Sequence, residues 1–303
     1  MNKKTHSRNL PAIPVILLIL LLVGVSLSLA ATEISPTPLA GSSLQVLSSE
    51  KDGLLGAEVN GVIDYPFNQV REALTAPAAW CDFLPLVFNV KSCIHGVHED
   101  RTLLTLFIGR KFFDPPEDAL QLEYIFRVLK QEEDRLRVLL TASEGPHGTR
   151  DYRIEVEARA DADGRTYLQL NSSFRPSLRS KFATGIYLAT TGSDKIGFSV
   201  LEKGGKSVHV GGTRGIVERN AMRYYLALKA YLDTLDVPEE NRFDARLNAW
   251  FDLTQRHPRQ LYEMSKMEYL NTKRRERRYQ LELQGRANPI QVRHERRKNA
   301  DRS

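Results

Sequence analysis

Polar and apolar residues alternate along much of the chain, which is the pattern of strands with one buried face. The alternation runs through residues 57–65, 120–128, 136–140, 152–158 and 168–174. Residues 86–97 and 101–110 are predicted to form one further pair of strands. Because short connections join successive strands, the pattern predicts a mostly antiparallel sheet, covered on one face and solvated on the other.

Shorter segments with other patterns interrupt the strands. Pro66 precedes a helical spacing over residues 67–75, and Pro77 starts a second short turn or helix. Residues 176–194 break the alternation and are expected to form a loop or short helix over the sheet. Residues 195–210 are predicted to form two more strands.

The clearest helix is predicted for residues 215–236, where apolar residues recur at intervals of four and three. They are Val217, Ala221, Tyr224, Leu228, Tyr231 and Leu235. Such a stripe requires a covering surface, and so does the sheet before it. The predicted fold class is therefore α+β, a curved antiparallel sheet gripping a long C-terminal helix.

This order of elements resembles the START and polyketide-cyclase-like superfamily, whose fold is called helix-grip. The resemblance rests on the order itself, on Gly211–Gly215 before the long helix, and on spaced positions near the start. These positions are Val62, Pro66, Phe67, Val70, Leu74, Pro77, Trp80 and Phe83. The resemblance covers residues 54–236 and implies a domain at 53–236. It further implies that an apolar molecule, a lipid, sterol-like or aromatic compound, is held between sheet and helix.

Eight residues are predicted to face such a cavity: Trp80, Phe83, Tyr124, Phe126, Tyr152, Phe174, Tyr224 and Leu228. Packing in a solid core is the alternative for each of them. The tyrosines are the more informative residues, because a buried hydroxyl group needs a hydrogen-bond partner. Several of them on one face predict a cavity that holds water or the polar end of a ligand.

The N-terminus has the three-part pattern of a signal peptide. Lys3, Lys4 and Arg8 precede an apolar run at 15–25, and Ser28 and Ala30 fit a cleavage site after residue 30. An uncleaved membrane anchor is the alternative, since ~20 apolar residues can span a bilayer. Both predict an exported chain, periplasmic or anchored to the outer face of the inner membrane. Residues 31–52 are rich in Ser, Thr and Pro, which predicts a flexible tether.

The net charge of +6 is concentrated at the two ends of the chain. Residues 237–272 are predicted to form a helical extension, and 273–303 a basic tail. The basic residues expected to contact an anionic membrane surface are Lys273, Arg274, Arg275, Arg277 and Arg278. A solvated tail is the alternative, and export argues against a nucleic acid as the partner.

Cys81 and Cys93 are the two cysteines of the chain. In an exported protein they are expected to form a disulfide, which would stabilise the fold by ~3 kcal/mol in the chain-entropy treatment. Two buried free thiols are the alternative. A metal site built from Cys93, His95, His98 and Glu99 is disfavoured, because the two histidines would point to opposite faces of a strand.

The sequence offers little for catalysis, and no cofactor is predicted. Ser143, His147 and Asp151 lie close together in the sequence, but there is no nucleophile elbow of the Gly-x-Ser-x-Gly type. The glycines at 211–215 lack the lysine and the spacing of a nucleotide loop. Binding of an apolar ligand is the first expectation. An enzyme of the cyclase or hydrolase type and an envelope scaffold are the alternatives.

Overall fold

The computed structural model describes residues 44–115, 118–180, 184–185 and 194–300, with side chains up to residue 287. The chain divides into two units, Met1–Ser35 and Pro36–Ser303, and all of these residues belong to the second. The predicted signal segment and residues 31–43 of the predicted tether lie outside the described residues.

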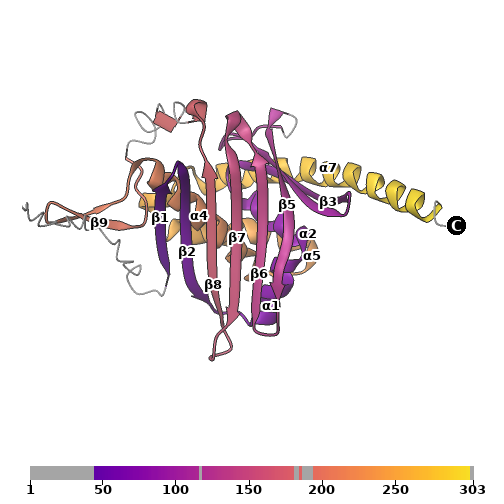
Figure 1. Ribbon diagram of the computed structural model, residues 1–303, viewed down its shortest axis with the longest axis horizontal. Helices are drawn as coiled ribbons and strands as arrows, with labels where there is room; N and C mark the ends of the chain where they lie inside the picture. The colour runs from indigo at the N-terminus through magenta and orange to yellow at the C-terminus, as the bar shows by residue number, and fades with distance from the viewer. Residues whose placement is uncertain (1–43, 116–117, 181–183, 186–193, 301–303) are drawn as a thin grey trace, which may run out of the picture. The chain divides into compact units, whose positions relative to one another are not determined.

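One antiparallel sheet of eight strands dominates this part of the chain, in the order β1-β2-β8-β7-β6-β5-β4-β3. Its strands are β1 (Gln45–Lys51), β2 (Leu54–Ile63), β3 (Val90–His98), β4 (Arg101–Ile108), β5 (Leu120–Gln131), β6 (Arg135–Glu144), β7 (Arg150–Ala160) and β8 (Thr166–Arg175). The predicted pair at 86–97 and 101–110 is β3 and β4. β2 and β8 lie side by side although they are distant in the sequence (Figure 1).

The two faces of the sheet differ as the alternation predicts. Val138, Leu140, Val156 and Leu168 are buried on the inner face. The outer face carries ion pairs, for example from Arg137 to Glu155. The inner face therefore supplies half of the core, and helices supply the other half.

Residues 45–51 correct the predicted tether, because they form the edge strand β1. Val46 and Ser48 point inward and are buried, while their neighbours are more exposed. Ser48 donates a hydrogen bond of 2.5 Å to the buried carboxylate of Glu218. The segment reads as a tether because its composition is polar. Ser48 can nevertheless be buried in a strand, because its partner Glu218 lies 170 residues away in the sequence.

The helix α4 (Gly212–Leu232) covers the inner face (Figure 1). It packs mainly on β2 and β1 and also contacts β8. Helices α1 (Phe67–Thr75) and α2 (Pro77–Phe83) and the 3-10 helix η1 (Leu84–Leu86) complete the cover. This arrangement confirms the predicted α+β helix-grip fold, with α4 beginning three residues earlier and ending four residues earlier than the predicted helix 215–236.

The two strands predicted within 195–210 are β9 (Val200–Lys203) and β10 (Lys206–His209). They pair with each other in a separate ribbon rather than extending the main sheet. Most of the loop or short helix predicted at 176–194 lies outside the described residues, which omit 181–183 and 186–193. The structure includes a short 3-10 helix, η3 (Pro146–Gly148), between β6 and β7.

Three helices follow α4 in the described part of the chain: α5 (Glu239–Gln255), α6 (Pro258–Leu261) and α7 (Lys266–Ala300). α5 packs on α4, and α7 runs along β3 at the edge of the sheet (Figure 1). The aromatic rings of Phe88, Trp250 and Tyr269 meet where these helices join the domain, with centroids 5.0 to 5.4 Å apart. Residues 273–300, expected as a basic tail, are therefore part of a helix.

None of the helices in the described residues combines the length and the hydrophobicity needed to cross a bilayer.

Candidate functional site

A cavity of about 230 Å³ lies between the inner face of the sheet and α4. Its walls come from β4, β5, β7, β8 and α4, and its rim from the loop around η3 and from Ser180. Leu106, Ile108, Leu122, Ile154 and Val217 make most of the wall apolar. Among the described residues, all those that line the cavity lie between Asn89 and Tyr224, so α5, α6 and α7 take no part in it.

Four of the predicted ligand residues line this cavity: Tyr124, Tyr152, Phe174 and Tyr224. The rings of Tyr152 and Phe174 stack with centroids 5.3 Å apart, and Tyr124 meets Tyr152 edge to face at 6.3 Å. The three strands β5, β7 and β8 thus form one aromatic wall. Tyr224 faces this wall from α4.

The other four predicted residues lie deeper in the core. Trp80, Phe83 and Leu228 line a void of about 10 Å³, which holds no more than a water molecule. Phe126 is buried, and its ring lies 6.1 Å from that of Trp80. Nε1 of Trp80 donates to the carbonyl oxygen of Leu74 at 2.9 Å. These residues support the wall from behind.

The polar residues of the lining were missed by the sequence reasoning. Asn220 lies on the apolar stripe of α4, four residues before Tyr224, and its Oδ1 accepts a hydrogen bond of 3.2 Å from Arg223. Asn89 precedes β3. A polar residue within an otherwise apolar stripe was the available signal for Asn220. Asn89 lies within the predicted strand at 86–97, in a stretch whose polar and apolar residues do not alternate, so no pattern marked it.

The rim of the cavity is built around Thr149. Its hydroxyl bonds the carbonyl oxygen of Pro146 at 2.5 Å and the hydroxyl of Tyr152 at 2.6 Å. Gly145 allows Tyr152 to approach, because a Cβ atom at this position would collide with the tyrosine ring. The backbone at the rim therefore fixes the orientation of Tyr152.

Burial perturbs the tyrosines of the cavity. It raises the pKa of Tyr124 well above its ordinary value, and the nearby hydroxyls of Tyr224 and Tyr152 raise it further. Burial likewise raises the pKa of Tyr224 to about 12. All three side chains are therefore neutral in the physiological range, and their hydroxyl groups can donate hydrogen bonds.

The residues considered for catalysis are not joined into a charge relay. Asp151 pairs with Arg175, 2.9 Å from carboxylate to Nε. His147 lies on the exposed rim, and its carbonyl oxygen accepts a hydrogen bond of 2.7 Å from Ser177. Within the described residues, no hydrogen bond connects the His147 imidazole to Ser143 or Asp151.

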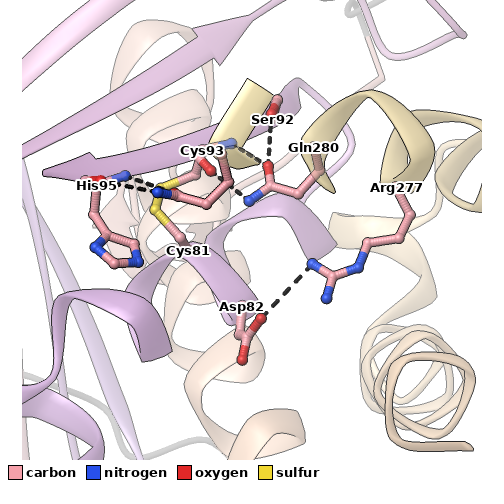
Figure 2. The surroundings of a disulfide bond; sticks show 8 residues. Cys81, Asp82, Ser92, Cys93, His95, Arg277 and Gln280 are labelled. Carbon is pink, nitrogen blue, oxygen red and sulfur yellow. Dashed lines mark hydrogen bonds and ion pairs between the residues drawn. A yellow bond between two sulfur atoms is a disulfide. The ribbon is translucent and has the colours of Figure 1, made fainter. Parts of the chain in front are cut away.

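The predicted disulfide is present between Cys81 on α2 and Cys93 on β3, with Cα atoms 4.9 Å apart. Figure 2 shows the bond beside the side chain of Gln280 of α7. The backbone N–H of Cys93 donates to Oε1 of Gln280 at 2.6 Å. The disulfide therefore fixes β3 to α2 on one side, while α7 covers it on the other.

The basic residues of α7 require one correction. Lys273 is buried, and its Nζ donates hydrogen bonds of 2.8 Å to the carbonyl oxygens of Val87 and Val90 and to Glu276. Burial lowers its pKa to about 8. It is thus a core residue that cannot reach a lipid headgroup.

The neighbouring arginines differ in their exposure. Arg274 pairs with Asp244 at 2.9 Å, and Arg277 pairs with Asp82 at 3.7 Å (Figure 2). The guanidinium group of Arg275 lies over the ring of Phe113, 3.7 Å from its centroid. Arg278 is exposed.

No protein family model matches the chain, and no curated protein matches it. Solved structures do match. A fragment of the STAR-related lipid transfer protein from Xanthomonas axonopodis is 12% identical, covering 66% of this chain and 98% of its own, with a TM-score of 0.40. Human STARD10 is 11% identical, covering 74% and 76%, with a TM-score of 0.36. CalU16 from Micromonospora echinospora is 12% identical, covering 72% and 98%, with a TM-score of 0.32.

The chain is thus similar to START and related helix-grip structures over much of its length, as its order of elements predicts. The assignment of its fold rests on its own sheet and on the helix that the sheet grips.

Proposed function

We propose that the protein binds a small apolar molecule in the cavity between its sheet and α4, as a carrier or a sensor. The observation that carries the proposal is the aromatic wall of Tyr124, Tyr152 and Phe174 facing Tyr224 across an open space. A plain core would fill this space, because protein interiors are close-packed. Apolar cavities with a few polar groups are the usual form of ligand sites.

The size of the cavity limits the ligand. An apolar cavity of about 150 Å³ holds benzene, and pockets for drug-sized ligands begin near 300 Å³. The volume of about 230 Å³ lies between them. A molecule of about ten non-hydrogen atoms therefore fits, such as a bicyclic aromatic or a medium-length chain.

We further propose that binding takes place outside the cytoplasm, near a membrane. The signal-peptide pattern of residues 1–30 supports export, and the excess of bases after residue 272 supports attraction to anionic lipid. A small apolar molecule partitions into bilayers. A binding protein attached or attracted to the membrane surface would therefore meet it at a high local concentration.

Filling the cavity tests the proposal. Ser172 lines the cavity on β8, and Ser172→Phe should occupy the space. We expect wild-type protein to bind naphthalene in a calorimetric titration, and Ser172→Phe to bind at least tenfold more weakly. The matched control is Asn171→Phe, on the same strand but paired with Glu58 and Glu155 of the polar face. The absence of naphthalene binding to the wild-type protein, or equal binding by Ser172→Phe, would contradict the proposal.

A further inference from the structure

Two of the three tyrosine hydroxyls in the cavity lack a hydrogen-bond partner among the described residues. The hydroxyl of Tyr152 is bound to Thr149. No such bond is made by the hydroxyls of Tyr124 and Tyr224, although Tyr124 is only 3% exposed. A hydroxyl group that faces a mostly apolar cavity without a partner costs free energy. The hydroxyl groups of Tyr124 and Tyr224 are therefore both available to form hydrogen bonds with a ligand in the cavity.

The two hydroxyls belong to opposite walls of one small cavity. Tyr124 lies on β5 and Tyr224 on α4, and both line the same space of about 230 Å³. A single oxygen atom of a ligand in this space can receive a hydrogen bond from each wall. Two donors from two elements fix the position of one polar atom better than either does alone.

The charges around the cavity exclude an ionised group as the partner. Apart from the three tyrosines, the charged or titratable side chains among the described lining residues are Arg153 and His147. The Arg153 guanidinium pairs with Glu155 at 2.5 Å, and His147 is exposed at the rim. Arg223, whose charge acts on Tyr224, is itself paired with Glu263 at 2.8 Å. A carboxylate beside Tyr124 would thus be desolvated without an unpaired counter-charge, which is costly. A neutral hydroxyl or carbonyl group would not incur this cost.

We propose that the ligand is an uncharged, mostly apolar molecule with one hydroxyl or carbonyl oxygen, held by hydrogen bonds from Tyr124 and Tyr224. This rests on the proposed function and specifies the class of ligand. Tyr124 and Tyr224 are then specificity-determining residues, because they distinguish an oxygenated molecule from the parent hydrocarbon.

The test compares 2-naphthol, naphthalene and 2-naphthoate, which differ only in the polar group. We expect wild-type protein to bind 2-naphthol about tenfold more tightly than naphthalene, the effect of hydrogen bonds from two donors. It should bind 2-naphthoate more weakly than 2-naphthol. The double variant Tyr124→Phe/Tyr224→Phe should bind naphthalene as well as wild type does, and should lose the preference for 2-naphthol.

The control is Tyr225→Phe on the same helix, a buried tyrosine that does not line the cavity and should keep the preference. Equal binding of 2-naphthol and naphthalene by the wild type would overturn the inference and leave the proposed function standing. So would an unchanged preference in the double variant. Tightest binding of 2-naphthoate would overturn the assignment of a neutral group. If none of the three compounds binds, the proposed function itself fails.

Discussion

Glu263, in the segment between α6 and α7, holds three separate parts of the fold together. Its carboxylate accepts a hydrogen bond of 2.8 Å from Arg223 on α4 and lies 3.3 Å from Nζ of Lys111, after β4. Lys195, which precedes β9, is 3.9 Å away. Glu263 and Arg223 are largely buried. Removal of this carboxylate would leave cations facing each other in a poorly solvated site.

The first prediction is that Glu263→Gln lowers the free energy of unfolding by about 2 kcal/mol at neutral pH. Burial raises the pKa of Glu263, but Arg223, Lys195 and Lys111 more than offset this, so that its pKa lies below the ordinary 4.5. A carboxyl group with a depressed pKa stabilises the fold above its unfolded pKa, and that stability is lost as the pH falls through the folded pKa.

Chemical denaturation of both proteins between pH 7 and pH 3 measures this. The stability difference should be constant down to about pH 5 and shrink below it. Glu99→Gln is the control, because Glu99 pairs with Arg101 on the surface, where an ion pair contributes little. A Glu263→Gln protein as stable as wild type at pH 7 would contradict the prediction.

Single residues also show what the sequence could predict of the cavity. A period of two placed Tyr124, Tyr152 and Phe174 on the inner face, and a period near 3.6 placed Tyr224 opposite. The period of a pattern predicts the face to which a side chain points, but not how far that side chain lies from the opposite wall. Whether an inward side chain borders a void or fills the core depends on the volumes of its neighbours, which is why Trp80 and Phe126 lie in packed core.

At the scale of elements, side chains of α7 form hydrogen bonds with backbone groups of the edge strand β3, as a neighbouring strand would. The N–H groups of Cys93 and His95 donate to Oε1 of Gln280 and Gln284, at 2.6 and 3.0 Å. Nε2 of each glutamine donates back to the carbonyl oxygen of the same residue. Gln280 and Gln284 are four residues apart on a helix, a rise of about 6.0 Å. Cys93 and His95 are two residues apart on a strand, a rise of about 6.7 Å. The spacing of the two glutamines therefore matches that of the two backbone groups they bond.

This contact blocks an exposed edge, where unpaired backbone groups invite pairing with other chains. Tyr269 and Lys273 extend it by donating to the carbonyl oxygens of Leu86 and Val87, each at 2.8 Å. Glu276 adds an ion pair of 2.9 Å with the buried Lys91. The first half of α7 is therefore a structural part of the domain.

The second prediction concerns Gln280→Glu, a change of nearly constant shape. The carboxylate can still accept from Cys93 N–H, but it cannot donate to the Cys93 carbonyl and would face it with a negative charge. We expect a loss of about 2 kcal/mol in the free energy of unfolding. The amide protons of Cys93 and His95 should also exchange faster with solvent, as measured by hydrogen exchange.

Glu282→Gln serves as the comparison, because Glu282 is exposed on the same helix and, among the described residues, pairs with Arg286. Unchanged exchange at Cys93 and His95 in Gln280→Glu would show that the glutamines do not close the edge.

The sequence predicted helix up to residue 272, but it could not reveal the rest of α7, for a physical reason. Helix α4 carries an apolar stripe, and its existence follows from burial of that stripe. The first half of α7 is held by polar side chains that bond backbone groups of β3, and such pairing leaves no hydrophobic period. The same holds for β1, where Ser48 is buried because it reaches Glu218. Polar residues satisfied by distant partners resemble solvated ones until the fold is known.

At the scale of the whole molecule, the basic residues of α7 that do not pack against β3 are the ones available to contact an anionic membrane. Gln284 is the last residue of α7 with a hydrogen bond to β3 in the described contacts. From Arg286 onward the sequence has six bases and two acids. Of the arginines expected to contact lipid, Arg274 and Arg277 are engaged in ion pairs within the domain. The membrane proposal therefore depends chiefly on the exposed Arg275 and Arg278 and on the bases after Gly285.

The third prediction is that a chain ending at Gly285 keeps its fold but loses most of its affinity for anionic membranes. Ending it at 272 would be a poorer test, because Gln280 and Gln284 would be lost and β3 exposed. We expect the full chain to bind vesicles of phosphatidylcholine with 30% phosphatidylglycerol, and more weakly at higher salt, since each base near such a surface contributes ~1 kcal/mol.

Cosedimentation of both chains with these vesicles, and with pure phosphatidylcholine as the control, measures the difference. Unfolding midpoints that agree would show that the truncated fold is intact. Equal binding of the two intact chains to anionic vesicles would then assign any membrane attraction to the domain itself, and the distal half of α7 would have no part in it.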